Sequence, residues 1–170
     1  PDAFTTTDVW SLDIMPAHEV RASVCNFNDT AFVCSSRLSI HDLVSHESHN
    51  ISEWVALSWK RNTLTYSEML DAAGNMASLL ISNGATDECI VALQIQRSLE
   101  QVISILGTML SHSVYLPLDA NWPLERRQFM IDDAKADFLV LRFATKDSSD
   151  FGGIVLLLTD ARALTRVELT

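Results

Sequence analysis

The sequence predicts an α/β fold: a partial, doubly wound and mainly parallel sheet with helices on both faces. Residues 89–95, 138–141 and 154–158 are almost continuously apolar, as expected of strands that are covered on both faces. The stretches before and between the first two runs instead show apolar side chains at helical spacing. Strands alternating with helices indicate βαβ units, which build parallel sheets.

The composition fits a globular chain and excludes several partners. With 170 residues and 48% hydrophobic content, the chain suits one domain or a piece of a larger one. No apolar run is long enough to span a membrane, and the polar N-terminus lacks a signal-peptide pattern. We therefore expect no membrane partner. The net charge of -10 would repel a phosphate backbone, so we expect no nucleic acid as partner either.

The cysteines indicate a reducing compartment. Cys25, Cys34 and Cys89 are odd in number, and we interpret them as reduced thiols in a cytoplasmic protein. One disulfide, between Cys25 and Cys34, stays open as an alternative.

Two regions follow from the pattern. Residues 1–37 have no sustained period and many turn-forming types, which predicts a linker or arm. Residues 38–170 hold the α/β elements. The first of these is a short helix at residues 38–44, which Ser39 caps, and the next is a strand at residues 54–59 followed by a turn at residues 60–62.

The best-defined element begins at Thr65. Thr65 and Glu68 form a capping box, and Asn83-Gly84 supplies a left-handed stop. The apolar positions between them recur at helical spacing: Tyr66, Met69, Leu70, Ala73, Ala77 and Leu80. One amphipathic helix is predicted.

The remaining elements alternate. After the strand at residues 89–95, Ser98 and Gln101 predict a second capping box and a helix with little polar face, followed by a strand at residues 114–118. Pro123 is placed in the first turn of a third helix that runs to about Lys135. Then come the strand at residues 138–141, a polar loop at residues 146–153 and a last buried strand at residues 154–158.

The glycines argue against a conventional phosphate loop. No Gly-x-Gly-x-x-Gly or Gly-Lys-Ser/Thr occurs, and only Gly152 and Gly153 lie close together. Arg97-Ser98, where a strand end meets a helix start, has two readings. It could hold an anion, or Ser98 caps the helix while Arg97 is solvated, and we favour the second.

Two groups of histidines are candidates for a metal site or a catalytic site. The polar stretch with its three histidines lacks the His-Glu-x-x-His spacing, so we favour a surface loop over a metal site; its residues are His41, Asp42, His46, Glu47 and His49. His112 stands between Ser111 and Ser113, but sequence neighbours seldom point at each other, which favours a structural role.

The carboxylates give one candidate. Asp132-Asp133 at a helix end should be solvated. Asp119 at a strand end is the one pre-positioned carboxylate, although capping of the turn before Asn121 accounts for it as well. We therefore predict no catalytic, cofactor-binding or metal-ligating residue.

An ordered set of motifs resembles the adenylation domains of nonribosomal peptide synthetases, within the adenylate-forming ligases. It comprises Asn28-Asp29-Thr30, Ile40-His41-Asp42-Leu43, Leu64-Thr65-Tyr66-Ser67-Glu68-Met69, Arg97-Ser98-Leu99-Glu100, Tyr115-Leu116-Pro117-Leu118-Asp119 and Pro123-Leu124-Glu125-Arg126-Arg127. The resemblance implies that residues 1–37 are the linker after a condensation domain. Residues 38–170 would be the incomplete N-terminal part of the large subdomain.

The resemblance also implies a reaction for the parent protein. The family condenses an acid with ATP and magnesium into an acyl adenylate, then loads the acyl group on the phosphopantetheine thiol of a carrier domain. Its phosphate loop, substrate pocket and catalytic lysine lie beyond Thr170. We therefore expect residues 1–170 to be noncatalytic scaffold that binds no cofactor, with condensation and carrier domains as neighbours. Which amino acid the parent activates does not follow.

One departure motivates an alternative. Where the family has a glycine that ends a helix, this chain has His112, which should cost on the order of 1 kcal/mol or force a different turn. Together with the absence of a phosphate loop, this departure motivates the second hypothesis, a naturally truncated or degenerate domain that acts as a spacer or docking module. A free-standing flavodoxin-like binder is the third.

Overall fold

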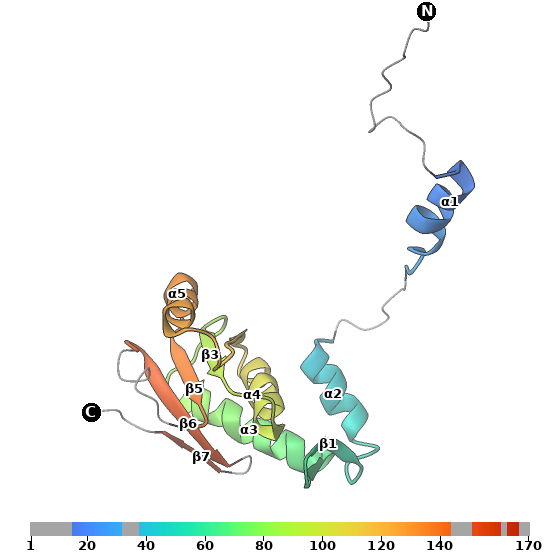
Figure 1. Ribbon diagram of the computed structural model, residues 1–170. Helices are drawn as coiled ribbons and strands as arrows, with labels where there is room; N and C mark the ends of the chain where they lie inside the picture. The colour runs from blue at the N-terminus through green and yellow to red at the C-terminus, as the bar shows by residue number, and fades with distance from the viewer. Residues whose placement is uncertain (1–14, 32–37, 144–150, 161–162, 167–170) are drawn as a thin grey trace, which may run out of the picture. The chain divides into compact units, whose positions relative to one another are not determined.

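The computed structural model describes residues 15–31, 38–143, 151–160 and 163–166 (Figure 1). The chain divides between Arg37 and Leu38 into two units, which we describe separately. Among the described residues, no helix has the length and apolar character needed to cross a membrane.

The first unit contains a short helical segment that the sequence did not predict. Helix α1, Ala17–Arg21, continues into a π-helical turn, η2, Ala22–Asn26. The Asn28 side chain donates from Nδ2 to Ser23 O and Val24 O, at 3.0 and 3.1 Å. Neither α1 nor η2 has a buried residue. Without a buried face, the segment needs no apolar side chains at helical spacing, which is the pattern that would have predicted it.

The second unit is built on a five-stranded sheet of order β4-β3-β5-β6-β7. Its strands are β3 Ile90–Gln94, β4 Val114–Pro117, β5 Phe138–Leu141, β6 Ile154–Asp160 and β7 Ala163–Arg166. The first four strands in that order are parallel, and β7 pairs antiparallel with β6. The predicted fold class is confirmed. The antiparallel strand β7 and the extension of β6 to Asp160 were not predicted.

Helices cover both faces of the sheet, as the continuous apolar strands predicted. On one face Met76 and Leu80 of α3, Tyr66–Ser82, pack against alternate strand residues: Val91, Leu93, Phe138, Val140, Leu156 and Leu158. On the other face Ile131 of α5, Leu124–Ala134, packs against the residues between them: Ala92, Leu139, Leu141 and Val155. Consecutive strand residues point to opposite faces, so both series had to be apolar.

Helix α4, Leu99–Leu110, packs closely along α3. Gly107 makes this possible, because a Cβ there would lie 2.5 Å from Met76 Cβ and 2.9 Å from Ala73 O. The side chain of Ile105 in α4 also packs against the α3 side of the sheet, so α3 and α4 share one face.

An antiparallel hairpin precedes α3. Strand β1, Val55–Trp59, pairs with β2, Asn62–Thr65, across a two-residue turn in which Lys60 has a φ of 57°. The first strand was predicted. The second was not, because Leu64 and Thr65 were assigned wholly to the start of the helix.

The capping box of α3 is confirmed and that of α4 is only half formed. Glu68 N donates to Thr65 Oγ1 at 3.2 Å, and Thr65 N donates to Glu68 Oε2 at 3.0 Å. At α4, Gln101 N donates to Ser98 Oγ at 3.4 Å, but the Gln101 side chain donates from Nε2 to Ile95 O instead of returning to Ser98.

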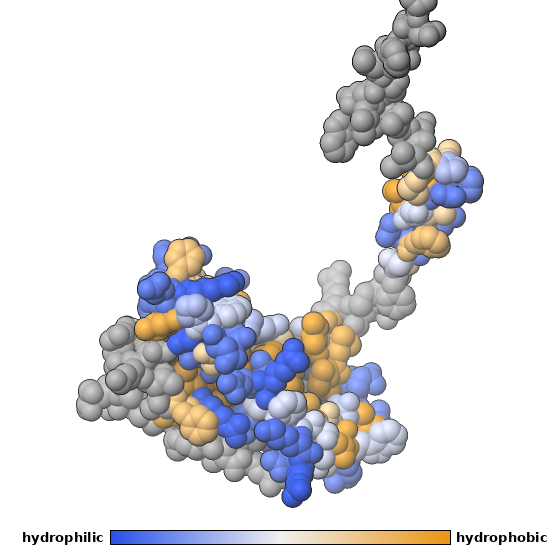
Figure 2. Space-filling view, in the orientation of Figure 1, coloured by the Kyte–Doolittle hydropathy of each residue, from blue (hydrophilic) through white to orange (hydrophobic). Residues whose placement is uncertain are grey.

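Helix α2 is longer than predicted. It runs over Ile40–Ser48 instead of ending near Val44. In the added turn, Ser45 Oγ donates to His41 O and Ser48 Oγ to Ser45 O. Ser39 is the N-cap, as predicted. Figure 2 shows apolar side chains over the start of this helix, where Leu38 and Ile40 are exposed.

The exit of α4 keeps the geometry that a glycine would give. His112 has a φ of 59°, its N–H donates to Met109 O, and Ser113 N donates to Thr108 O. This pair of bonds is the Schellman motif. Of the two outcomes expected for His112, a strained residue or a different turn, the structure has the first, because the two backbone bonds hold the left-handed residue in place.

Strand β4 lies at the edge of the sheet. Val114 N donates to Cys89 O and Leu118 N donates to Leu93 O, on the β3 side. The backbone N–H groups of the odd-numbered residues between them therefore point away from β3. Pro117 is one of these, and its missing N–H costs the sheet no bond.

Candidate functional site

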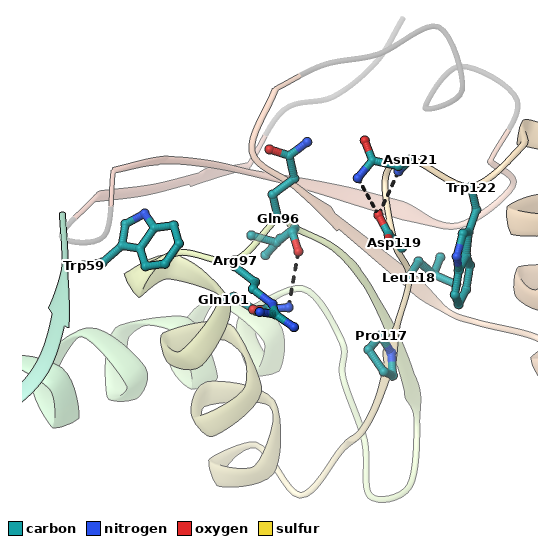
Figure 3. A pocket seen from close by; sticks show the side chains of 10 residues that line it. Trp59, Gln96, Arg97, Gln101, Pro117, Leu118, Asp119, Asn121 and Trp122 are labelled. Carbon is teal, nitrogen blue, oxygen red and sulfur yellow. Dashed lines mark hydrogen bonds between the residues drawn. The ribbon is translucent and has the colours of Figure 1, made fainter.

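An open cleft of about 690 Å³ lies at the carboxyl ends of β3 and β4 (Figure 3). Its lining residues are Trp59, Ile95, Gln96, Arg97, Gln101, Pro117, Leu118, Asp119, Asn121 and Trp122. The helix after β3, α4, and the helix after β4, α5, lie on opposite faces of the sheet. The order β4-β3-β5-β6 places the topological switch point between β3 and β5, so the cleft beyond β3 and β4 lies beside it and not at it.

The β3 side of the cleft carries its cation. Ser98 caps α4 and Arg97 is exposed, as the favoured reading of this pair predicted. No ion pair or hydrogen bond of the Arg97 guanidinium occurs within the part of the chain that the structure describes. Gln101 is tied to Ile95 O and so joins the strand end to the helix start.

The β4 side is a rigid turn. Asp119 Oδ1 accepts from Asn121 N at 2.9 Å and from Asn121 Nδ2 at 3.0 Å, and Trp122 N donates to Asp119 O at 3.0 Å. The pre-positioned carboxylate thus caps a turn, which was the alternative explanation offered from the sequence.

Arg127 holds the same turn through hydrogen bonds to its backbone carbonyls. The sequence did not predict this role of Arg127. Its side chain is buried, and Nη1 donates to Ala120 O at 2.9 Å and to Trp122 O. Arg126 lies over the Trp122 ring, 4.4 Å from its centroid. The only sequence signal was the Pro-Leu-Glu-Arg-Arg motif, which carries no information on where the guanidinium points.

A second missed interaction ties α4 to β5. Glu100, in the first turn of α4, is 8% exposed, and its Oε1 lies 3.4 Å from Nη2 of Arg142, just after β5. The carboxylate also lies at the helix end that favours negative charge. Glu100 was noted only as a member of a motif, because burial of a charged residue has no local sequence signal.

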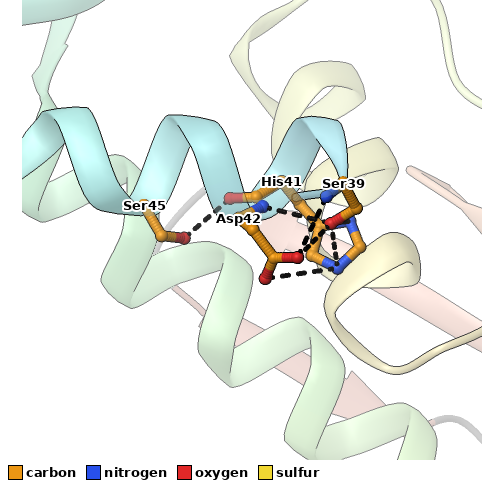
Figure 4. A network of polar contacts seen from close by, with 4 residues as sticks. All are labelled: Ser39, His41, Asp42 and Ser45. Carbon is orange, nitrogen blue, oxygen red and sulfur yellow. Dashed lines mark hydrogen bonds and ion pairs between the residues drawn. The ribbon is translucent and has the colours of Figure 1, made fainter. Parts of the chain in front are cut away.

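The histidine stretch forms a helix and not the predicted surface loop. Ser39 Oγ lies 2.6 Å from Asp42 Oδ2 and 3.1 Å from the His41 ring (Figure 4). His46 and His49 are exposed, and His49 Nδ1 lies 2.8 Å from Ser45 O. Within the described ranges, no three His, Cys, Asp or Glu side chains are grouped as a metal site would require.

Asp42 has the one perturbed carboxyl of this network. The Ser39 hydroxyl and then the Ser39 backbone N–H bond to it and lower its pKa below the ordinary value, and His41 adds to this. The hydrogen bonds and the nearby imidazole favour the charged carboxylate, and so does its place at a helix N-terminus.

The other candidates have structural roles. His112 is exposed, whereas Ser111 and Ser113 are buried, with Ser111 Oγ 2.8 Å from Thr108 O and 3.0 Å from Ser113 Oγ. Within the described residues no hydrogen bond joins the His112 ring to either hydroxyl.

The acidic pair and the cysteines complete the set. Asp132 and Asp133 are exposed, as predicted. Cys89 Sγ lies 3.2 Å from Ser113 Oγ. The alternative Cys25–Cys34 disulfide involves a residue outside those that the structure describes.

The cleft can bind a group but offers no complete reaction centre. Its one cation and its amide side chains suit recognition, and its one carboxylate is held in a turn. No glycine is among the described residues that line the cleft, so the lining lacks the glycine-rich loop that commonly holds the phosphates of a nucleoside triphosphate. We derive no step of a reaction through these residues.

Comparisons with known proteins identify the family. Residues 45–167 match the model of the AMP-binding enzyme family. Tyrocidine synthase 3 of Brevibacillus parabrevis is 31% identical over 129 residues, which are 76% of this chain and 2% of the relative. The chain thus spans a very small part of the curated relatives that it matches.

Solved structures agree. The Klebsiella oxytoca NpsA N-terminal subdomain has a TM-score of 0.64 and 26% identity, over 70% of this chain and 31% of that one. An artificially fused adenylation-PCP di-domain from the same organism, NpsA-ThdA, has a TM-score of 0.57 and 28% identity, over 59% of this chain and 19% of that one.

Proposed function

The chain belongs to the AMP-binding enzyme family and forms the N-terminal part of a nonribosomal peptide synthetase adenylation domain, and we infer that its parent protein activates an amino acid with ATP. The products would be an aminoacyl adenylate and pyrophosphate. The acyl group would then pass to the phosphopantetheine thiol of a carrier domain.

The family match over residues 45–167 carries this proposal. The fused adenylation-PCP structure supports a carrier domain as neighbour, and the linker-like motif before α2 supports a condensation domain. We place the parent in the cytoplasm, which agrees with the odd number of cysteines.

Within this proposal, residues 1–170 act as scaffold. We assign the binding of ATP, magnesium and the thiol to the rest of the parent. The substituted stretch around His112 no longer favours the spacer alternative, since the α4 exit keeps the Schellman geometry. The lack of a phosphate loop in residues 1–170 still does.

Amino-acid-dependent exchange of pyrophosphate into ATP tests the function. The full parent protein should catalyse exchange with one or a few amino acids, and residues 1–170 alone should not. A parent that shows no exchange with any of the proteinogenic amino acids or common aryl acids would favour the spacer. Exchange by residues 1–170 would contradict the scaffold role.

A further inference from the structure

We propose that the Asn83–Gly84 pair at the end of α3 is a site of spontaneous deamidation, and that local opening of this helix end controls the reaction. It is the one Asn-Gly pair in the sequence. Gly84 has no Cβ to crowd its backbone nitrogen, which makes this the most reactive asparagine position of the chain once it is unfolded. The inference is independent of the proposed function, because the reaction needs no enzyme.

The reaction consumes water alone. Gly84 N attacks Cγ of Asn83, the bond between Cγ and Nδ2 breaks, and Nδ2 leaves as ammonia with the proton from Gly84 N. Water then adds to either carbonyl carbon of the resulting cyclic imide. Opening at one carbonyl gives aspartate, and opening at the other gives isoaspartate, in which the main chain runs through Cβ and Cγ. No oxidant, reductant or group donor takes part.

The folded helix end keeps the two reacting groups apart. Gly84 N donates to Ile81 O at 3.0 Å, and Asn83 Nδ2 donates to Leu79 O at 2.8 Å. Ring closure needs Gly84 N on the same side of the Asn83 main chain as Cβ, which corresponds to a ψ of about -120° at tetrahedral Cα geometry. The ψ of Asn83 is 11°. The imide therefore cannot form while the helix end is folded.

A Schellman motif closes this helix end. Gly84 has a φ of 94°, its N–H bonds to Ile81 O, and Ala85 N donates to Leu80 O at 3.0 Å. Ala85 packs against the same side of the core as Leu80. Gly84 is exposed, so water reaches the pair when these bonds break. Helix ends open at a lower cost in free energy than core strands do, and such opening is sufficient for the reaction.

The products should not restore the closed helix end. A carboxylate at residue 83 cannot donate to Leu79 O, and it adds negative charge at the helix end that disfavours it. Three carboxylates line the small cavity beside Asn83: Asp87, Glu88 and Asp137. No lysine or arginine is among the described residues of that lining. Isoaspartate also lengthens the main chain, which displaces the bonds of the Schellman motif. Modification therefore accumulates in one direction.

Incubation of the parent protein in water enriched in oxygen-18 tests the control by folding. Mass spectrometry of the peptide that contains Asn83 gives the rate, and the label marks modification that occurs during the incubation. The native protein should react at least about tenfold more slowly than the protein in urea, because the imide forms only after local opening. Isoaspartate should be a product in both states. Equal rates in the two states, or aspartate without isoaspartate, would overturn the proposal.

Two matched variants separate local opening from global unfolding. Ala85→Gly weakens the motif that closes α3. Ala136→Gly removes the same methyl group from the corresponding position after α5, where Ala136 N donates to Ile131 O at 3.1 Å. Ala85→Gly should raise the native rate at Asn83 severalfold, Ala136→Gly should leave it unchanged, and neither should alter the rate in urea. Acceleration by both variants alike, or by neither, would contradict local control.

A charge variant tests whether the product restores the helix end. Asn83→Asp creates the aspartate product directly and should lower the Tm of the parent by roughly 2–4 °C. Asn75→Asp is the control, since Asn75 is exposed near the middle of α3 and adds the same charge away from the helix end. An equal Tm for the two variants would show that aspartate restores the helix end, and the proposed one-way accumulation would then be wrong.

Discussion

At the scale of single residues, hydrogen bonds decide which polar side chains are structural. Asp119 has the position of a catalytic carboxylate, yet Asn121 takes one of its oxygens with two bonds and makes it a turn cap. Arg127, which no sequence argument singled out, is buried and holds two carbonyls of the same turn. The sequence shows for Asp119 and for Arg127 only a charged residue within a motif. Their hydrogen bonds in the structure show what each side chain does.

The Asp42 carboxyl should titrate below the usual range of aspartate. Its folded pKa is lowered, so its contribution to stability is present above the ordinary aspartate value and is lost as the pH falls through the folded pKa. Side-chain NMR titration checks this, and Ser39→Ala should raise the Asp42 pKa toward the ordinary value. The same midpoint in both proteins would rule out the Ser39 bonds as the cause.

His112→Gly should stabilise the protein by about 1 kcal/mol, because glycine enters the left-handed region without the penalty that other residues pay. Urea denaturation measures the change. His49→Gly is the control and should destabilise, since His49 ends α2 with an ordinary φ of -58°. Lower stability of His112→Gly would show that the imidazole itself makes a stabilising contact.

At the scale of elements, local signals were sufficient for most helices and strands. The caps at Ser39, Thr65 and Ser98 are where the sequence put them. The errors have two causes. Helix α2 continues through a polar stretch without a hydrophobic period, and β2 and β7 each form by pairing with a neighbouring strand. Pairing between strands is not a local property, so local patterns cannot predict it.

Two glycine variants should separate helix packing from helix propensity. Gly107→Ala should destabilise by about 1–3 kcal/mol, since its Cβ would overlap Met76 at the contact of α3 and α4. Gly74→Ala, within α3, meets nothing within 4 Å and should stabilise by about 0.5–1 kcal/mol. Thermal and urea denaturation of both proteins checks the opposite signs. Stabilisation by both substitutions would mean that the two helices lie further apart than described.

At the scale of the whole molecule, the sheet joins two apolar layers. The α3 side and the α5 side each depend on alternate residues of the same strands, so β3, β5 and β6 serve both. This explains why the strands are apolar throughout and why the fold class was the most secure expectation from the sequence.

Leu156→Ala should destabilise the protein by about 2–5 kcal/mol, because Leu156 is fully buried on the α3 side of β6 and its loss leaves a cavity. Ile81→Ala, at a site 55% exposed, should change stability by less than about 0.5 kcal/mol. The midpoints of urea denaturation, compared at equal m-values, give the loss of stability in each of the two variants. Similar effects would place β6 outside the cooperative core.

The sequence by itself determined the α/β class, the order of the main elements, most helix caps and the family resemblance, because these depend on residues near one another in the chain. The tertiary structure alone decided which strand forms the edge, how α4 approaches α3 at Gly107, and that Asp119 caps a turn beside the cleft. These features bring together residues that are distant in sequence. Their free energies come from burial and pairing, which no local pattern encodes.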